Sequence, residues 1–273
     1  MNLLIIGFGV VGQAVYEGLV ENNIIDLLDI EPNDDIDYSS YDGIIICLPT
    51  PQGPRGECDD MLVEQYITTI RMEVPAVPIL IKSTISPELI ELLQDDRYLT
   101  TNPEFLTEKN AIDDFINPDK HIFGGNDGFI DNLEFYYKEY SLCRPCPVHR
   151  MSAVDASFVK YGINSFLAMK VLFFNQLYDV VENNEAAYNK IVNAITSDSR
   201  IGRSHSAVPG LDNKRGYGGA CFPKDTSALF NLDKGFTLLG ECVRINNEYR
   251  SQYELDQREI EQHVDYGQTE EKQ

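Results

Sequence analysis

A glycine-rich turn directly after the first apolar run constrains this chain more than any other feature. Residues 7–12 read GFGVVG, between the apolar run Leu3–Ile6 and a helical pattern over Gln13–Val20. In this context GxGxxG lets backbone N–H groups at a helix N-terminus approach a pyrophosphate. Asp29 follows at roughly the 20-residue distance where a carboxylate binds ribose hydroxyls and repels the extra phosphate of NADP. The sequence therefore predicts NAD as cofactor, bound by Gly7, Gly9, Val10, Val11, Gly12 and Asp29.

The first half of the chain alternates apolar runs with helical patterns. Runs at Ile24–Leu28, Gly43–Leu48 and Pro78–Ile81 predict buried strands, and Met61–Met72 predicts a further helix. Buried strands that alternate with helices are typical of a doubly wound parallel sheet. We therefore expect an α/β fold whose N-terminal Rossmann domain covers residues 1–148.

The second half has a different pattern. From Ser152 to about Ile195 the spacing of apolar residues is helical and almost uninterrupted by glycine or proline. Val208–Lys224 is glycine-rich and irregular, and helical spacing returns from Leu238 to about Gln262. We expect an all-α domain over 149–262 with a long central helix. Residues 263–273, rich in Glu, Gln and Asp, are expected to form a disordered acidic tail.

The composition excludes several classes of partner. The net charge of -22 over 273 residues repels phosphate backbones and anionic lipid, so neither nucleic acid nor a membrane is expected as a partner. The apolar start carries no basic leader, and six scattered cysteines favour a reducing compartment, so we expect a cytoplasmic protein. Cys143 and Cys146 form a CxxC without a second pair, which predicts ordinary thiols and no metal site.

Two clusters carry residue types suited to catalysis. Cys221 follows a run of glycines, and the adjacent Lys224 would favour its thiolate, while Asp225 could activate a water. Lys160 and Asn164 are four residues apart, so they share one face of the predicted helix and can converge on one ligand. From spacing alone, a structural loop thiol and a snorkelling lysine remain open as alternatives.

The order of the motifs resembles that of the UDP-glucose 6-dehydrogenase and GDP-mannose dehydrogenase family. The similar blocks are GFGVVG at 7–12, ICLPTP at 46–51, KSTI at 82–85, NPEFLTEKNAIDDF at 102–115, FVKYGINSFLAMK at 158–170, SRIG at 199–202 and GYGGACFPKD at 216–225. The resemblance implies a four-electron oxidation of a sugar C6 alcohol to a carboxylate, with UDP-glucose the most expected nucleotide sugar. Cys221 would form a thiohemiacetal and then a thioester.

The resemblance also implies roles for individual residues. Lys160 and Asn164 would stabilise oxyanions, Asp225 or Glu104 would activate the hydrolytic water, and Thr84 would help to hold it. Implied cofactor contacts are Thr50, Pro51, Ser83, Thr84, Glu108 and Lys224. Implied substrate contacts are Glu104, Phe105, Leu106, Lys160, Asn164, Tyr217 and Gly218. Arg200 would reach the substrate of a neighbouring subunit, in a homodimer built on the central helix.

The sequence departs from the family pattern in places. It ends soon after Arg250, so we expect a short form that lacks the family's C-terminal nucleotide-binding domain. The stretch from Asp29 to Asp42 is shorter than usual, and Lys109 stands where the family has glycine. Two alternatives stay open. One is a one-step hydroxyacid dehydrogenase, which also pairs a helical lysine with an asparagine but does not need Cys221; the other is an NAD-binding regulatory protein without turnover.

Overall fold

The computed structural model describes residues 1–29 and 36–267, which form two compact units. Unit 1 comprises residues 1–50 and 59–160, and unit 2 comprises residues 51–58 and the chain from Tyr161 onward. The sequence predicts a boundary at residue 148, whereas unit 1 extends to Lys160. The reason is that Ala153 and Val154 pack against the apolar core of unit 1.

Unit 1 is built on a seven-stranded sheet with the order β2-β1-β3-β4-β5-β6-β7. The strands are β1 (Asn2–Ile6), β2 (Ile24–Leu28), β3 (Gly43–Ile46), β4 (Ile79–Ile81), β5 (Leu99–Thr101), β6 (His121–Gly125) and β7 (Val148–Met151). All neighbouring strands in this order run parallel except β5 and β6, where Thr100 pairs with Gly125 in antiparallel register. The predicted doubly wound α/β fold is confirmed, with one antiparallel pair that the sequence pattern did not predict.

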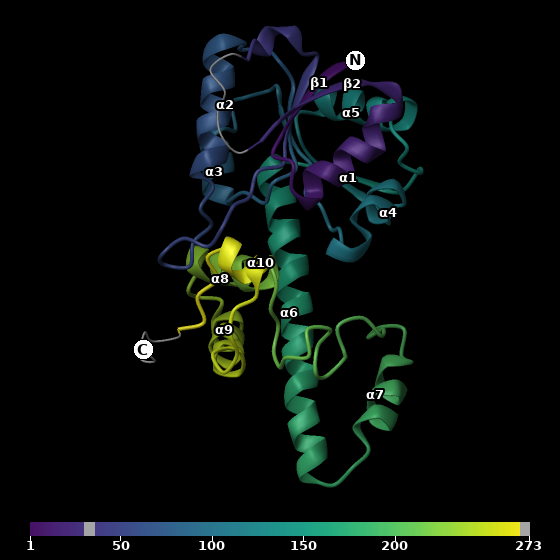
Figure 1. The fold of residues 1–273 in the computed structure, drawn as a ribbon, viewed down its shortest axis with the longest axis vertical. Helices are drawn as coiled ribbons and strands as arrows, with labels where there is room; N and C mark the ends of the chain where they lie inside the picture. The colour runs from purple at the N-terminus through teal and green to yellow at the C-terminus, as the bar shows by residue number, and fades with distance from the viewer. Residues whose placement is uncertain (30–35, 268–273) are drawn as a thin grey trace. The chain divides into compact units, whose positions relative to one another are not determined.

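Helices cover both faces of this sheet (Figure 1). They are α1 (Val10–Leu19), α2 (Met61–Glu73), α3 (Pro87–Leu92), α4 (Ala111–Ile116) and α5 (Asp127–Tyr140), with short 3-10 turns η1 (Val20–Asn22), η2 (Tyr38–Ser40) and η3 (Glu108–Asn110). Successive side chains of a strand point to opposite faces. Leu4 and Ile6 therefore join a core with α2 and α3, while Leu3 and Ile5 join a second core with α1, α4 and α5.

Unit 2 is helical, as predicted. Its elements are α6 (Ala153–Asn183, whose first turns belong to unit 1), α7 (Tyr188–Thr196), α8 (Phe222–Leu232), α9 (Thr237–Arg250) and α10 (Gln257–Glu261). The predicted helix to Ile195 is in fact two helices, because the chain turns after Asn183 with Glu185 at a φ of 53°. Phe174 and Val181 of α6 pack against α7, whereas Ala168 and Leu172 pack in a cluster with residues of α8 and α9.

The segment after α10 differs from the expected disordered tail. Val264 and Tyr266 are both buried, and the Tyr266 hydroxyl donates to Glu259 Oε1 at 2.8 Å. Two apolar side chains with a buried partner hold residues 263–267 in place, which corrects the prediction for this part. The rest of the predicted tail, residues 268–273, lies outside the described residues. Across residues 1–29 and 36–267, no helix is long and apolar enough to cross a membrane.

Candidate functional site

The glycine-rich turn lies at the carboxyl end of β1. Gly7 has a φ of 91°, and a Cβ at this position would lie 2.7 Å from the Cys47 carbonyl oxygen. Its N–H donates to the Leu28 carbonyl at 2.8 Å, which ties the turn to the end of β2. A side chain at position 7 would therefore break both the backbone conformation and the close approach to Cys47. The local structure explains why the turn begins with glycine.

The residues after Gly7 leave the N-terminus of α1 without a side-chain cap. Gly9 is the N-cap residue of α1, and glycine has no side chain with which to cap the first backbone N–H groups. In the described part of the chain, a Cβ built on Gly9 would meet no atom within 4 Å. Gly9 and Val10 are exposed, whereas Val11 is half-buried and Gly12 is buried.

The sheet order places this helix end where an open α/β sheet binds ligands. β1 lies between β2 and β3, so the chain order reverses beside the glycine turn. Asp29 follows the carboxyl end of β2 and is exposed. Open N–H groups, a positive helix end and a carboxylate one strand away fit a dinucleotide with ribose hydroxyls. These residues of unit 1 therefore fit the predicted cofactor, NAD.

Further predicted cofactor residues lie at the carboxyl ends of β3 and β4. The Thr50 hydroxyl donates to the Thr84 carbonyl at 2.7 Å, and the Ser83 hydroxyl donates to the Leu48 carbonyl at 2.7 Å. These bonds join the two segments at the strand ends. Glu108 is exposed in η3, while Pro51 begins the short segment that belongs to unit 2.

Lys160 and Glu104 form a buried ion pair in unit 1. The Lys160 ammonium donates to Glu104 Oε1 at 2.9 Å and to the Glu104 carbonyl at 2.5 Å. The side chains are 4% and 11% exposed, respectively. Burial alone would raise the pKa of Glu104, but Lys160, the Leu106 N–H and Lys82 outweigh it and lower that pKa. Glu104 is consequently a carboxylate at neutral pH.

A cavity of about 300 Å³ in unit 1 is lined by three predicted substrate residues, Glu104, Phe105 and Leu106. The ammonium groups of Lys160 and Lys120 each lie 5.3 Å from the centre of the Phe105 ring. Cations over an aromatic face are attracted by its quadrupole. The ring therefore takes part in the electrostatics of the cavity.

Lys82 and His121 also line this cavity, although neither was predicted from the sequence as a site residue. Burial lowers the pKa of Lys82 to about 8, although Cys47 and Glu104 oppose the shift. Lys82 donates to Asn102 Oδ1 at 2.8 Å. Burial, assisted by Lys82, lowers the pKa of His121 to about 4. The signal for Lys82 was its position directly after a predicted buried strand, where a lysine must either be paired or be used.

Cys221 is not in an irregular loop, as the sequence pattern predicted, but is the N-cap residue of α8. Pro223 stands in the first turn of that helix, and Asp225 is an acidic residue in the same turn. Both are known signals of a helix start and could have revealed it, but the preceding glycines masked them. A cysteine at a helix N-terminus lies where partial positive charge favours the thiolate.

Lys224 adds a full positive charge to the same region. Its burial would lower its pKa, but Asp225 and the thiols of Cys58 and Cys221 outweigh this and raise that pKa. Lys224 Nζ donates to Asp225 Oδ1 at 2.7 Å. Lys224 is therefore positively charged at neutral pH and lies near the two thiols. Its ammonium group is buried and paired with the Asp225 carboxylate.

The Asp225 carboxylate has a donor on each oxygen. Asn164 Nδ2 donates to Asp225 Oδ2 at 2.6 Å, and Lys224 occupies Oδ1. Asn164 and Asp225 are 6% and 1% exposed. Three of the predicted site residues therefore form one buried hydrogen-bonded group within unit 2.

The remaining predicted substrate residues of unit 2 have different surroundings. The Tyr217 ring packs in the cluster with Leu172 and Phe222, and its hydroxyl lies 3.3 Å from Thr226 Oγ1. Gly218 lies against Arg250, which gives it a packing reason to be glycine. Arg200 is exposed and pairs with Asp198 at 2.5 Å. Their predicted contacts with substrate stay predictions.

The cysteines bear on redox chemistry and metal binding. All six lie in the described part of the chain, and none of them forms a disulfide there. The Cys143 thiol donates to the Phe115 carbonyl at 3.1 Å. Within residues 1–29 and 36–267, no group of three or more His, Cys, Asp or Glu side chains is placed to hold a metal ion.

The sequence matches two models of one protein family. Residues 14–139 match the NAD binding domain of the UDP-glucose/GDP-mannose dehydrogenase family, and residues 154–248 match its central domain. Most of the first match lies in unit 1, and most of the second lies in unit 2. The predicted NAD cofactor agrees with the matched domain.

Individual relatives and solved structures show the same likeness. UDP-glucose 6-dehydrogenase TuaD of Bacillus subtilis is 29% identical over 85% of this chain and 52% of its own length. UDP-glucose 6-dehydrogenase of Rickettsia bellii is 31% identical over 78% of this chain and 50% of its own length. This chain thus spans about half the length of these curated relatives.

Among solved structures, a UDP-glucose dehydrogenase from Pyrobaculum islandicum has a TM-score of 0.78 at 24% identity, covering 92% of this chain and 69% of that chain. A 3-hydroxyisobutyrate dehydrogenase from Mycobacterium tuberculosis has a TM-score of 0.71 at 16% identity, covering 91% and 93%. Both likenesses establish the fold. With the two matched domain models in chain order, this protein belongs to the UDP-glucose/GDP-mannose dehydrogenase family.

Proposed function

We propose that this protein oxidises the C6 alcohol of a nucleotide sugar to a carboxylate in two steps, with NAD as acceptor and UDP-glucose as substrate. The relatives named UDP-glucose 6-dehydrogenase support the substrate class. The observation that carries the proposal is the position of Cys221 at the start of α8, with the Lys224 cation close to its thiol. A one-step alcohol oxidation has no use for a nucleophile there.

The second oxidation explains why a thiol is needed. An aldehyde carbon cannot readily release a second hydride until a nucleophile adds to it. The Cys221 thiolate forms a carbon–sulfur bond to the aldehyde, and the resulting thiohemiacetal is oxidised to a thioester. Water then breaks the carbon–sulfur bond, which releases the carboxylate and returns the thiol. NAD bound at the start of α1 would accept one hydride in each oxidation, so two NAD molecules would be reduced in turn per sugar.

The charged residues of both units have roles in this scheme. Lys160 stabilises the oxyanions that develop on the substrate oxygen, because its ammonium is held in a fixed position by Glu104. Glu104 is a carboxylate that lines a cavity, so it can take a proton from the hydrolytic water. The Thr84 hydroxyl is the proposed second group that holds this water. In unit 2, Asn164 and Lys224 hydrogen-bond to Asp225 in the first turn of α8 and hold its carboxylate in place.

The test is a stoichiometric assay. Purified protein is incubated with NAD and a panel of UDP- and GDP-linked sugars, and NADH is followed by its absorbance. We expect two NADH per UDP-glucose consumed. Cys221→Ser is expected to lose at least about 1,000-fold in turnover, and Cys242→Ser serves as the matched control at a thiol outside the proposed chemistry.

Two alternatives predict different results in the same assay. When hydroxy acids are added to the panel, a one-step hydroxyacid dehydrogenase would yield one NADH per hydroxy acid consumed, none with the sugars, and would keep full activity in Cys221→Ser. A regulatory protein would bind NAD tightly and release no NADH with any sugar. Either result overturns the proposal.

We also infer a homodimer built on α6. Three apolar side chains of this helix are exposed at seven-residue intervals, Phe166 (63%), Phe173 (58%) and Val180 (58%). Seven residues are close to two helical turns, so these side chains form one stripe on the helix. A dimer would bury this stripe. It would also bring a second subunit near enough for Arg200 to contact that subunit's substrate, as proposed above. Light scattering should report a dimer that Phe166→Glu/Phe173→Glu converts to a monomer; a monomeric wild type refutes it.

Cytoplasmic localisation stays a prediction.

A further inference from the structure

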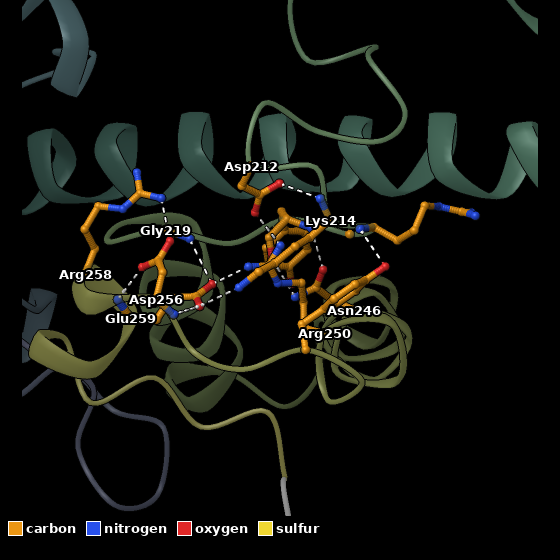
Figure 2. A network of polar contacts seen from close by, with 12 residues as sticks. Asp212, Lys214, Gly219, Asn246, Arg250, Asp256, Arg258 and Glu259 are labelled. Carbon is orange, nitrogen blue, oxygen red and sulfur yellow. Dashed lines mark hydrogen bonds and ion pairs between the residues drawn. The ribbon is translucent and has the colours of Figure 1, made fainter.

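A buried polar network lies behind the glycine-rich loop that precedes Cys221, and the chemistry above makes no use of it (Figure 2). Its centre is the ion pair of Arg250, the last residue of α9, with Glu259 in α10. Arg250 Nη2 lies 2.5 Å from Glu259 Oε1, and both side chains are 1% exposed. Charged side chains are rarely buried this deeply unless they are paired with an opposite charge.

Glu259 connects three segments of unit 2 through one carboxylate. Its Oε1 atom accepts the Gly219 N–H at 3.2 Å and the Tyr266 hydroxyl at 2.8 Å, in addition to Arg250. Its Oε2 atom accepts the Asp256 N–H at 2.9 Å, which closes the capping box of α10. The loop, the helix α10 and the chain after it thus share a single acceptor group.

Arg250 approaches the loop from the other side. Its Nη1 atom donates to Asp212 Oδ2 at 2.7 Å. A Cβ at Gly218 would lie 2.2 Å from Arg250 Nη2, so the guanidinium lies directly against the backbone of the loop. Any side chain at position 218 would push the loop away from Arg250.

A second residue of α9 fixes the loop one position earlier. Asn246 Oδ1 accepts the Tyr217 N–H at 2.7 Å, and Asn246 Nδ2 donates to the Tyr217 carbonyl at 3.0 Å. Both peptide groups of Tyr217 and the N–H of Gly219 are therefore held by buried side chains. Because glycines have great backbone freedom, the loop from Gly216 to Gly219 needs such external contacts to keep one conformation.

We propose that the Arg250–Glu259 pair is a positioning device for the reactive thiol, which fixes the Gly218–Gly219 backbone and so places Cys221 at the start of α8. This proposal rests on the proposed thioester chemistry. The hydrogen bonds of the pair reach the loop backbone at Gly219, not the thiol itself, so the pair would act through the two peptide groups between Gly219 and Cys221. Position matters here because a nucleophile displaced by about 1 Å can lose about 100-fold in rate.

If the pair only stabilises the fold, a folded variant that lacks it should keep the wild-type loop and the wild-type kcat. Buried ion pairs can often be replaced by apolar side chains of similar volume without loss of stability. The double variant Arg250→Met/Glu259→Leu removes both charges and also the acceptor of the Gly219 N–H. The matched control is Arg244→Met/Glu248→Leu, which makes the same replacements at an exposed ion pair of α9.

Two measurements distinguish a positioning role of the pair from a purely structural one. Amide hydrogen exchange, recorded without substrate, should be about tenfold or more faster at Gly219 in the double variant, with the amides of α6 unchanged. The kcat for NADH formation should fall about 100-fold while the affinity for NAD stays the same. The control should match the wild type in both.

The results distinguish this inference from the proposed function. A folded double variant with wild-type exchange at Gly219 overturns the positioning role, whether or not any sugar is turned over. Faster exchange with wild-type kcat also overturns it. If the wild type turns over no sugar, the proposed function fails, but the exchange experiment still decides whether the pair fixes the loop. If the double variant does not fold, Glu259→Gln keeps the shape of the side chain but removes its charge, which weakens the bond to the Gly219 N–H; exchange and kcat should then change in the same directions but by less.

Discussion

Glu104 in unit 1 and Asp225 in unit 2 are both buried carboxylates paired with a lysine, but their access to water differs. The lysine–carboxylate distances are alike, 2.9 Å for Lys160–Glu104 and 2.7 Å for Lys224–Asp225. The Glu104 side chain is 11% exposed and lines a cavity, whereas the Asp225 side chain is 1% exposed and also accepts a bond from Asn164. A carboxylate can activate water only where water can enter. We therefore propose Glu104 as the base and Asp225 as a positioning residue.

The largest effect is expected from substitutions of the two carboxylates themselves. Glu104→Gln removes the base but keeps the size of the side chain, so the thioester should form and persist, and turnover should fall about 10²- to 10⁴-fold. Mass spectrometry after incubation with NAD and UDP-glucose should detect a covalent adduct on Cys221. Asp225→Asn should lower turnover without an adduct. An adduct in Asp225→Asn but not in Glu104→Gln would reverse the two assignments.

The next effect concerns the lysine of unit 1. Lys160→Met leaves the buried Glu104 carboxylate without its cation, which should cost about 3–5 kcal/mol of unfolding free energy. Turnover should fall about 10²- to 10³-fold, because one donor to the oxyanion is lost. Denaturant unfolding and NADH formation measure the two effects. Lys138→Met, at an exposed ion pair of α5, is the control and should change neither; a Lys160→Met variant as stable as this control would contradict the buried pair.

A smaller effect tests the second lysine near Glu104 through pH. The pKa of Lys82 is about 8 in the folded protein and ordinarily 10.5. Above pH 8 the unfolded chain therefore binds more protons than the folded one, so stability should rise with pH. Burial raises the pKa of four thiols, Cys47, Cys143, Cys146 and Cys242, above their ordinary value of 9.0, and these thiols oppose the rise as the pH approaches 9. Between pH 8 and 9, the slope of the unfolding free energy against pH should therefore be more positive in the wild type than in Lys82→Met; equal slopes would refute the assignment.

The smallest effect is expected at an exposed ion pair. Arg200 and Asp198 are in contact, but the Arg200 side chain is 87% exposed, so solvent screens the interaction. Arg200→Ala should leave the thermal unfolding midpoint unchanged, in contrast to Lys160→Met. A clear loss of stability would show that charge alone, rather than burial, determines the importance of an ion pair in this protein.

Much of unit 1 could be predicted from the sequence, because β1, β3 and β4 are buried apolar strands and the glycine turn has a fixed context. The run that forms β2 was also predicted as a buried strand, but β2 lies at the sheet edge and is mostly exposed. The runs that form β1 to β4 are apolar and are separated by recognisable helices. β5 has only three residues, Leu99–Thr101, which is too short to show a period. Its antiparallel neighbour β6 depends on pairing between distant residues, and one sequence does not show such pairing.

The candidate site was only partly predictable. The residue types at Cys221, Asp225 and Lys160 were found from motifs, but their partners were not. Spacing shows that Lys160 and Asn164 share a helix face; it does not show that Glu104 accepts from one and Asp225 from the other. The network around Glu259 was missed entirely, because the helical spacing predicted from Leu238 to about Gln262 does not show which distant groups a glutamate on that helix contacts.

The contact between Gly219 and Glu259 has a consequence for synthesis of the protein, because these residues are 40 positions apart in the chain. At roughly 5–20 residues per second, a ribosome needs about 2–8 s to add Glu259 after Gly219. During that interval the loop has been made but its anchor has not. The thiol of the nascent chain is therefore expected to react with alkylating agents at a rate unlike that of the finished protein, which arrested chains ending before and after α10 can test. The proposed catalytic cysteine would thus be translated well before it is placed for its chemistry.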